Sequence, residues 1–248
     1  MLLLFDIDGT LLQGASREHA LALYESLGEV YGVRDPQAAG VQAAGRTDLE
    51  IARAILLCQG VSARRIDARM DHFSEVCCRR FARLCPASLV DRVVPGMVAV
   101  LDWLSADERA RVTLVTGNLQ PIARLKLARA GISHHFASGQ GGFGSDSEDR
   151  LDLPPLARRR AVSVPWEAPT DGEQGSTVAR TSSYARERTL IIGDTPRDIA
   201  CARADGLRCI AVSTGPYGAQ ELTQADAVAG DAADLRRLLE AELQRVSG

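Results

Sequence analysis

Two carboxylates lie one residue apart near the start of the chain. The sequence FDIDGTLL, residues 5–12, places Asp6 and Asp8 after an opening run that is wholly apolar, and a Gly-Thr turn follows. An apolar run this short is typical of a buried strand in a parallel sheet. Ligands bind at the carboxyl ends of such strands, so we expect chemistry at Asp6 and Asp8, although acidic turns are also common.

Further polar residues follow later apolar runs. They are Thr116, Gly117 and Asn118 in LVTGN, and Asp194 and Asp198 in IIGDTPRDI. Converging carboxylates repel one another unless a cation lies among them, and oxygen ligands of this kind suit Mg²⁺. Thr116 and the backbone N–H groups after it could hold an anion at the start of a helix. Carboxylates, Mg²⁺ and an anion site together indicate phosphoryl transfer.

Asp198 has a second explanation, which is helix capping. Thr195 can be the N-cap, Pro196 the first helical residue and Asp198 the acidic third residue of a helix. Asp194 fits this explanation less well, because it lies at the strand end and not inside the helix.

Alternating strands and helices must position these groups. Segments that resemble the first strand cover residues 111–118, 135–139, 188–196 and 208–215. Helical patterns lie between them, and two of these end at the glycines Gly131 and Gly206, a common C-terminal signal. This order predicts an α/β fold with a Rossmann-like parallel sheet core flanked by helices.

The connection after the first strand is too long for a simple crossover. Roughly a hundred residues separate Asp8 from Thr116, and structureless loops of that length do not occur inside compact domains. Apolar spacings of three and four predict a helix over residues 64–84 and another over residues 21–31. Thr47 and Glu50 form a capping box that opens a third helix.

We therefore expect an inserted all-helical subdomain over residues 14–93. The α/β core then comprises residues 1–13 and 94–248, and the helix after Pro95 belongs to it. Residues 161–188 are rich in Pro, Gly, Ser and Thr without a clear period, which predicts a mobile loop.

Composition excludes several classes of function. A formal net charge of −3 offers no basic surface for nucleic acid or an anionic membrane. No apolar run reaches transmembrane length, so we expect a cytoplasmic protein. The six cysteines have neither zinc-site nor disulfide spacing and are interpreted as buried thiols. Among 29 basic residues, Lys126 is the single lysine.

The motifs resemble those of the haloacid dehalogenase-like superfamily, in its phosphatase branch. DIDGT is similar to the first motif of that family, LVTGN to the second and IIGDTPRDI to the fourth, in the right order over residues 1–215. The helical insertion lies where this branch carries a cap domain. The resemblance implies a Mg²⁺-dependent phosphatase of a small phosphorylated metabolite.

The resemblance also implies a role for each matched residue. Asp6 would be the nucleophile that forms an aspartyl-phosphate, and Asp8 the general acid and base. Asp6, Asp8 through its backbone carbonyl, and Asp194 would bind Mg²⁺, with Asp198 supporting the metal site from its edge. Thr116 would hold the phosphoryl group, next to Gly117 and Asn118 as substrate-binding residues.

The sequence departs from the family pattern at the third motif, where a lysine is usual. Arg150, in GSDSEDRLDLPPL, lies where that lysine belongs, and we expect it to orient Asp6, although a plain surface arginine would fit the same acidic loop. Lys126 lies more than two helical turns past its strand. At about 1.5 Å per residue, this predicts a distance above ~10 Å from the site.

Arg46 precedes the helix capped by Thr47 and is a further candidate for substrate binding. An arginine beside a helix N-terminus favours anions. We expect it to reach the site from the inserted helices, with an exposed arginine of no consequence as the alternative.

Two other functions stay open. A phosphomutase, such as a sugar-phosphate mutase, would share all of these residues, and a noncatalytic phosphate-sensing protein would share the acidic residues and the threonine. The expected partner is a small phosphorylated metabolite, not nucleic acid or membrane, and the expected state is a monomer or weak homodimer.

Overall fold

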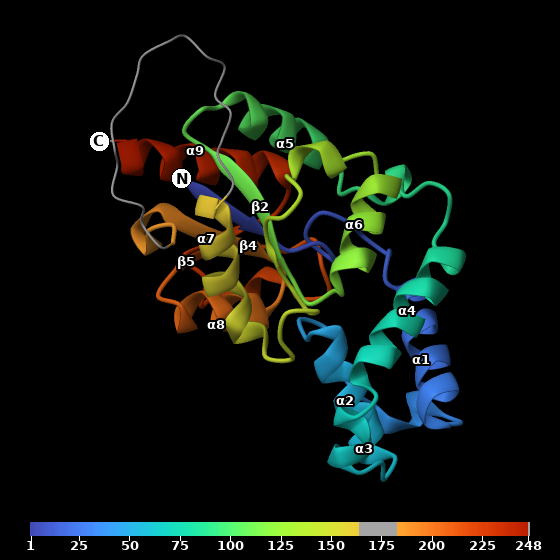
Figure 1. Ribbon diagram of the computed structural model, residues 1–248. Coiled ribbons are helices and arrows are strands. Elements are labelled where there is room, and N and C mark those ends of the chain that lie inside the picture. Colours follow the sequence, from blue (N-terminus) through green and yellow to red (C-terminus); the bar gives the residue numbers. More distant parts are fainter. Residues whose placement is uncertain (164–182, 248) are drawn as a thin grey trace.

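The computed structural model describes residues 1–163 and 183–247. These residues form a six-stranded parallel sheet in the order β3-β2-β1-β4-β5-β6 (Figure 1). The strands are β1 Leu2–Phe5, β2 Arg111–Thr116, β3 Gly142–Phe143, β4 Thr189–Gly193, β5 Arg208–Val212 and β6 Ala227–Ala229. The strand order reverses at β1, which lies between β2 and β4. Such a reversal opens a crevice at the carboxyl ends of the strands.

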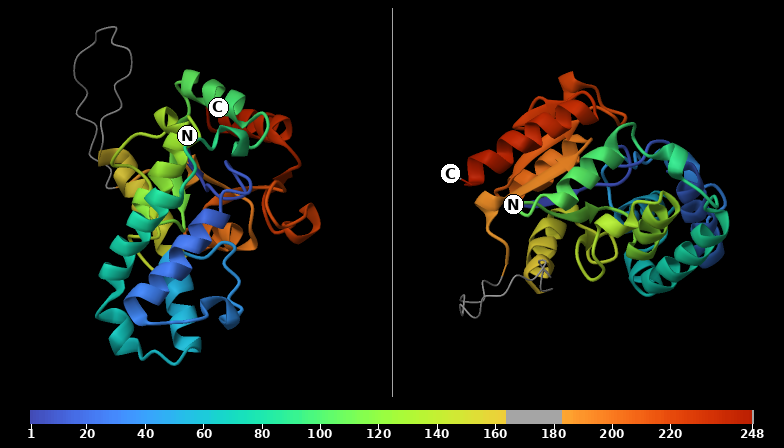
Figure 2. Two further views of the ribbon diagram at one scale, coloured as in Figure 1. Left: turned by 90° about the vertical axis from the view of Figure 1, so that its right-hand side faces the viewer. Right: turned by 90° about the horizontal axis from the view of Figure 1, so that it is seen from above.

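Helices cover both faces of the sheet, so its strands are buried on each side (Figures 1 and 2). Leu3 and Phe5 of β1 join the hydrophobic core under α5, α6 and α9, whereas Leu2 and Leu4 pack with α7 and α8. Successive residues of an extended strand therefore supply two separate cores. The covering helices are α5 Met97–Ala106, α6 Gln120–Arg129, α7 Leu153–Ser163, α8 Pro196–Ala204 and α9 Ala232–Ser247.

The long connection between β1 and α5 is helical, as the sequence predicts. Its helices stand together at one end of the sheet, where α1 and α4 pack along each other (Figure 1). They are α1 Arg17–Tyr31, α2 Asp48–Cys58, α3 Ala63–Asp67 and α4 Met70–Leu84, with 3₁₀ turns at Pro36–Ala39 and Val90–Arg92. No helix within the described residues is long and apolar enough to cross a bilayer.

The chain leaves and re-enters the core at one place. Leu12 and Val93 form an antiparallel bridge, and the N–H of Gln13 donates to the carbonyl of Arg92 at 2.7 Å. These contacts lie beside the expected hinges. The boundaries of the inserted subdomain themselves stay a prediction.

Two helix predictions differ in detail from the structure. The helix expected over residues 64–84 is divided into α3 and α4 at Ala68 and Arg69. The apolar spacing runs through the break because Ile66 and Met70 still face the same core. The capping box expected at α2 is half formed, because the Thr47 hydroxyl accepts from the N–H of Glu50 at 3.0 Å whereas the Glu50 carboxylate pairs with Arg46.

The strand predictions are confirmed for β2, β4 and β5, and one is wrong. The strand expected at residues 135–139 lies instead at Gly142–Phe143, because residues 133–135 form a 3₁₀ turn that buries Phe136 in the core. The short strand β6 had no sequence signal. Of the loop expected over residues 161–188, residues 164–182 lie outside the described residues, and residues 161–163 end α7. The remaining 3₁₀ turns are Arg150–Asp152, Arg186–Arg188 and Ala219–Glu221.

Candidate active site

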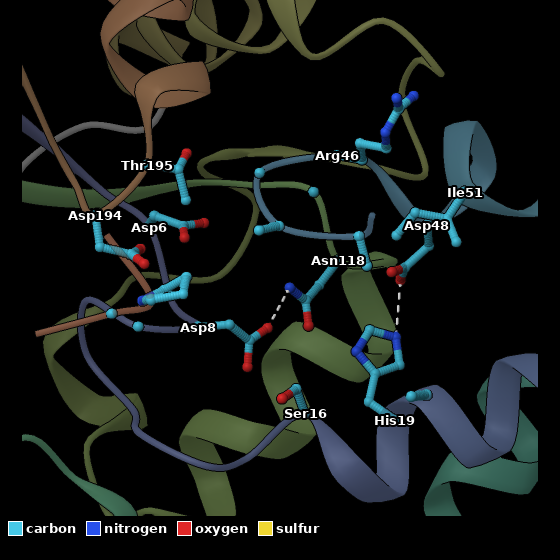
Figure 3. A pocket seen from close by; sticks show the side chains of 18 of the residues that line it. Asp6, Asp8, Ser16, His19, Arg46, Asp48, Ile51, Asn118, Asp194 and Thr195 are labelled. Carbon is cyan, nitrogen blue, oxygen red and sulfur yellow. Dashed lines mark hydrogen bonds and ion pairs between the residues drawn. The ribbon is translucent and has the colours of Figure 1, made fainter. Parts of the chain in front are cut away.

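Three buried carboxylates meet at the carboxyl ends of β1 and β4. One oxygen from each of Asp6, Asp194 and Asp198 lies within 4.8 Å of the other two. The backbone N–H of Asp6 still donates to Ile192 of β4 at 2.9 Å, so Asp6 stays in register with its neighbour strand. The cluster therefore depends on the sheet itself, and Figure 3 shows Asp6 and Asp194 side by side.

The backbone comes close to the carboxylate of Asp194 at two glycines. A Cβ atom at Gly9 would lie 2.1 Å from Oδ2 of Asp194, and one at Gly215 would lie 1.8 Å from it. Oδ1 accepts from the Thr10 hydroxyl at 3.0 Å, whereas Oδ2 is buried without a hydrogen-bond partner. A buried carboxylate oxygen without a partner is costly. Its presence beside Asp6 fits a bound divalent cation, for which such oxygens are suitable ligands.

Burial and mutual repulsion disturb the protonation of these acids. Burial raises the pKa of Asp194 to about 9, with the charges of Asp198 and Asp6 adding to the shift. Burial also raises the pKa of Asp6 to about 7, against the opposing charge of Arg150. Without a cation the cluster thus holds protons at neutral pH, and a metal ion would displace them.

Asp198 is held by two sets of contacts. With Thr195 it forms a full capping box at the start of α8, in which Oδ2 accepts from the Thr195 N–H at 3.0 Å and its hydroxyl at 2.7 Å. Its other oxygen, Oδ1, accepts from Arg150. Asp198 therefore caps α8 and also lies at the edge of the acidic cluster, and its support of a metal ion stays a prediction.

Arg150 lies beside the predicted nucleophile. Its Nη2 is 3.1 Å from Oδ1 of Asp6 and also pairs with Asp198. The residue opens a 3₁₀ turn, and its carbonyl accepts from the Cys201 thiol at 3.1 Å, which fixes its backbone against α8. Burial lowers the pKa of Arg150, but the charges of Asp198 and Asp6 raise it by more than burial lowers it. The guanidinium therefore stays charged.

The carboxylate of Asp8 has other partners than the carboxylate of Asp6. The Asp8 carboxylate accepts from the Asn118 side-chain amide at 2.8 Å (Figure 3). The same amide donates to the Thr116 hydroxyl at 3.0 Å. Asn118 therefore links the ends of β1 and β2. Gly117 packs against the loop that precedes α2, because a Cβ there would lie 2.1 Å from the carbonyl oxygen of Arg46.

The expectation that Lys126 lies far from the site is wrong. Its Nζ donates to both carboxylate oxygens of Asp8, at 2.7 and 2.6 Å, and to Oδ1 of Asn118 at 2.7 Å. Helical side chains lean toward the N-terminus of their helix. The long lysine side chain thus reaches back along α6 to the strand end, and the rise along the helix axis overestimates the separation.

Arg46 lies at the pocket, but its side chain has another partner. The guanidinium pairs with Glu50, four residues later on α2, and points away from the acidic cluster (Figure 3). Its part in binding substrate stays a prediction.

A cavity of about 440 Å³ lies between the acidic cluster and the inserted helices. Its floor carries Asp6, Asp8, Asp194 and Arg150, and its opposite wall is mostly apolar. That wall contains Ala20, Leu23 and Tyr24 of α1, Ala43 and Ala44 of the following loop, and Ile51 of α2.

Two residues at the site carry no signal in the sequence. His19 of α1 and Asp48 of α2 are buried, and their side chains are joined by a contact of 3.0 Å between Nε2 and Oδ2 (Figure 3). Neither belongs to a motif, because their proximity depends on how the inserted helices pack on the sheet.

Two protein-family models match the chain. A family model described as haloacid dehalogenase-like hydrolase matches residues 3–203, and a second, described as HAD-hydrolase-like, matches residues 174–238. No curated protein sequence matches the chain.

Several solved structures share the fold at low identity. A haloacid dehalogenase-like family hydrolase from Streptococcus pneumoniae is 20% identical, with a TM-score of 0.60 over 96% of this chain and 97% of that one. A β-phosphoglucomutase from Clostridium difficile is 12% identical, with a TM-score of 0.66 over 99% and 97%. A CbbY variant from Rhodobacter sphaeroides, in complex with xylulose 1,5-bisphosphate, is 18% identical, with a TM-score of 0.62 over 94% and 95%.

Proposed function

Because the chain belongs to the haloacid dehalogenase-like hydrolase family, we propose that it is a Mg²⁺-dependent phosphatase of a small phosphorylated metabolite. The observation that carries the proposal is the unpartnered buried oxygen of Asp194 beside Asp6, at the floor of the cavity. This arrangement supports a divalent cation and a phosphoryl group at the same place.

In the proposed mechanism Asp6 attacks the phosphorus atom and forms an aspartyl-phosphate as the bond from phosphorus to the leaving-group oxygen breaks. Asp8, in its protonated form, gives its proton to that oxygen. A water molecule then attacks the intermediate, gives its proton to Asp8 and releases phosphate and free Asp6. Thr116 and the N–H groups after it bind the phosphoryl oxygens. Mg²⁺, held by Asp6, the Asp8 carbonyl and Asp194, with Asp198 at the edge, would supply charge neutralisation.

We further propose that residues 14–93 act as a cap domain over a core of residues 1–13 and 94–248. The cap would cover the leaving group with the apolar wall of α1 and α2. Exclusion of water there strengthens each charged contact at the floor.

A phosphomutase and a phosphate sensor are the alternative functions. A mutase must bind a substrate with two phosphate groups. Arg46 of the inserted segment is the candidate to bind the second phosphate, but its guanidinium is paired with Glu50. This pairing favours hydrolysis. The likeness to β-phosphoglucomutase concerns the fold alone.

Phosphate release tests the proposed function directly. We expect steady, Mg²⁺-dependent hydrolysis of p-nitrophenyl phosphate, and loss of activity in EDTA. A panel of phosphorylated sugars, short acids and nucleotides, followed for both free phosphate and isomerised product, identifies the substrate. Isomerised product without free phosphate would indicate a mutase, and binding without turnover would indicate a sensor.

Stability should depend on pH and metal together. In EDTA, Asp6 and Asp194 have folded pKa values of about 7 and about 9, above the ordinary 3.8. The folded protein therefore binds more protons than the unfolded chain, and stability falls as pH rises from about 4 to 9, by up to about 1.4 kcal/mol per pH unit for each proton. Because Mg²⁺ replaces those protons, it should raise Tm more near pH 8 than near pH 6.

Thermal melts with EDTA or Mg²⁺ across this range measure the effect. Asp194→Asn is the matched variant, since it removes one titrating group and one metal ligand, and it should flatten both dependences. An equal Mg²⁺ shift at the two pH values would contradict the assignment of these acids to the metal.

A further inference from the structure

Lys126 lies in a network that joins the core to the inserted helices. The side chain has no exposed surface, and its Nζ lies 3.2 Å from Nδ1 of His19 in addition to its contacts with Asp8 and Asn118. The ring of Phe81, on α4, lies 5.9 Å from the same nitrogen. A charged group buried this completely is costly unless it is fully paired.

The hydrogen bonds of His19 have only one consistent direction. An ammonium group donates and cannot accept, so Nδ1 of His19 accepts from Lys126. Nε2 then carries the proton and donates to Oδ2 of Asp48. This oxygen also accepts from the N–H of Leu119 at 2.7 Å, at the start of α6, the helix that carries Lys126. The inserted helices thus hold α6 at Leu119, the residue just before its start, and at Lys126.

Asp8 depends on this network for its position. Its side chain is 28% exposed and reaches the cavity, so the protein holds it only through Asn118 and Lys126 among the described contacts. Both of its oxygens accept from Nζ, which is the arrangement of a carboxylate. A carboxylate is the form that takes a proton from an attacking water.

We propose that Lys126 is a positioning residue that holds Asp8 for the hydrolysis of the aspartyl-phosphate, and that His19 and Asp48 hold Lys126. The inference rests on the proposed phosphatase function. In the step concerned, the water oxygen bonds to phosphorus, its proton passes to Asp8, and the bond from phosphorus to Asp6 breaks. Asp6 is restored as a carboxylate and phosphate leaves.

Lys126→Met separates this step from the first one, because p-nitrophenolate leaves without needing a proton. We expect kcat for p-nitrophenyl phosphate to fall by about a hundredfold, KM to fall in parallel, and kcat/KM to stay close to wild type. Rapid mixing should show a burst of p-nitrophenol, with the phosphoenzyme trapped by acid. His19→Ala should show the same pattern more weakly.

Matched variants show whether the change in kinetics is specific to Lys126 or is a general structural effect. Arg129→Met on the same helix and His72→Ala on α4, both exposed, should behave as wild type. The double variant Lys126→Met/Asp8→Asn removes both charges of the pair, so it should fold, and it should be no slower than Asp8→Asn alone.

Three outcomes would overturn the inference. A Lys126→Met enzyme that loses kcat/KM as much as kcat, without a burst, has an ordinary structural defect. A further loss in the Asp8→Asn background shows that Lys126 does not act through Asp8. Wild-type protein that releases no phosphate from any substrate refutes the proposed function first, and the inference with it.

Discussion

Asp6→Asn is expected to abolish turnover and leave the fold intact. The substitution keeps the shape of the side chain and removes the nucleophile. We expect kcat to fall at least about a thousandfold, since loss of a nucleophile elsewhere costs up to ~10⁶-fold. Burial raises the pKa of Asp6, and repulsion from the charges of Asp198 and Asp8 adds to the shift. The neutral amide relieves that repulsion, so the metal-free variant should melt no earlier than wild type near pH 8.

Phosphate release and thermal melting measure the two halves of this prediction. Mass spectrometry after an acid quench should find phosphate on Asp6 in the wild-type protein and none in the variant. Activity within about tenfold of wild type would exclude nucleophilic catalysis by Asp6. Phosphate trapped on Asp8 instead would reverse the roles of the two residues.

Most of the residues at the floor of the site can be predicted from the sequence, because the end of a strand is a local feature of the chain. An apolar run ends, a carboxylate follows, and parallel strands bring such ends to one edge. Asp6, Asp194 and Asp198 meet for this reason. Thr195 likewise caps α8 through residues that are its neighbours in the chain.

The parts that the sequence did not reveal depend on packing between distant elements. The contact of Lys126 with Asp8 joins residues 118 positions apart and requires α6 to fold back along the strand end. His19 and Asp48 meet through the packing of two inserted helices. Arg46 lies at the pocket, yet Glu50, four residues later on α2, takes its guanidinium. Local patterns do not decide between such competing partners.

Arg150→Ala is expected to be nearly inactive. A bound phosphate monoester carries about −1.5 to −2 charges, and Asp6, Asp194 and Asp198 add three more. Mg²⁺ offsets two, so the guanidinium beside Asp6 is a substantial part of the remaining compensation. Loss of such a contact in a water-poor site should lower kcat by about 10²–10³-fold. Arg150→Lys should be partly active, since it keeps the charge but loses the planar guanidinium whose Nη2 contacts both Asp6 and Asp198.

Arg150→Ala also removes the positive partner of two buried carboxylates, which should lower the free energy of unfolding by about 3–5 kcal/mol. The double variant Arg150→Ala/Asp198→Asn removes the second charge, so its Tm should recover while its kcat does not. Arg158 forms a similarly buried pair with Asp205 at 2.8 Å, and neither residue lines the cavity. Arg158→Ala should therefore lower Tm and keep the kcat of the folded enzyme. If kcat in the Arg150 series follows Tm, as it would for a structural pair, then Arg150 acts on the fold and not on the phosphoryl group.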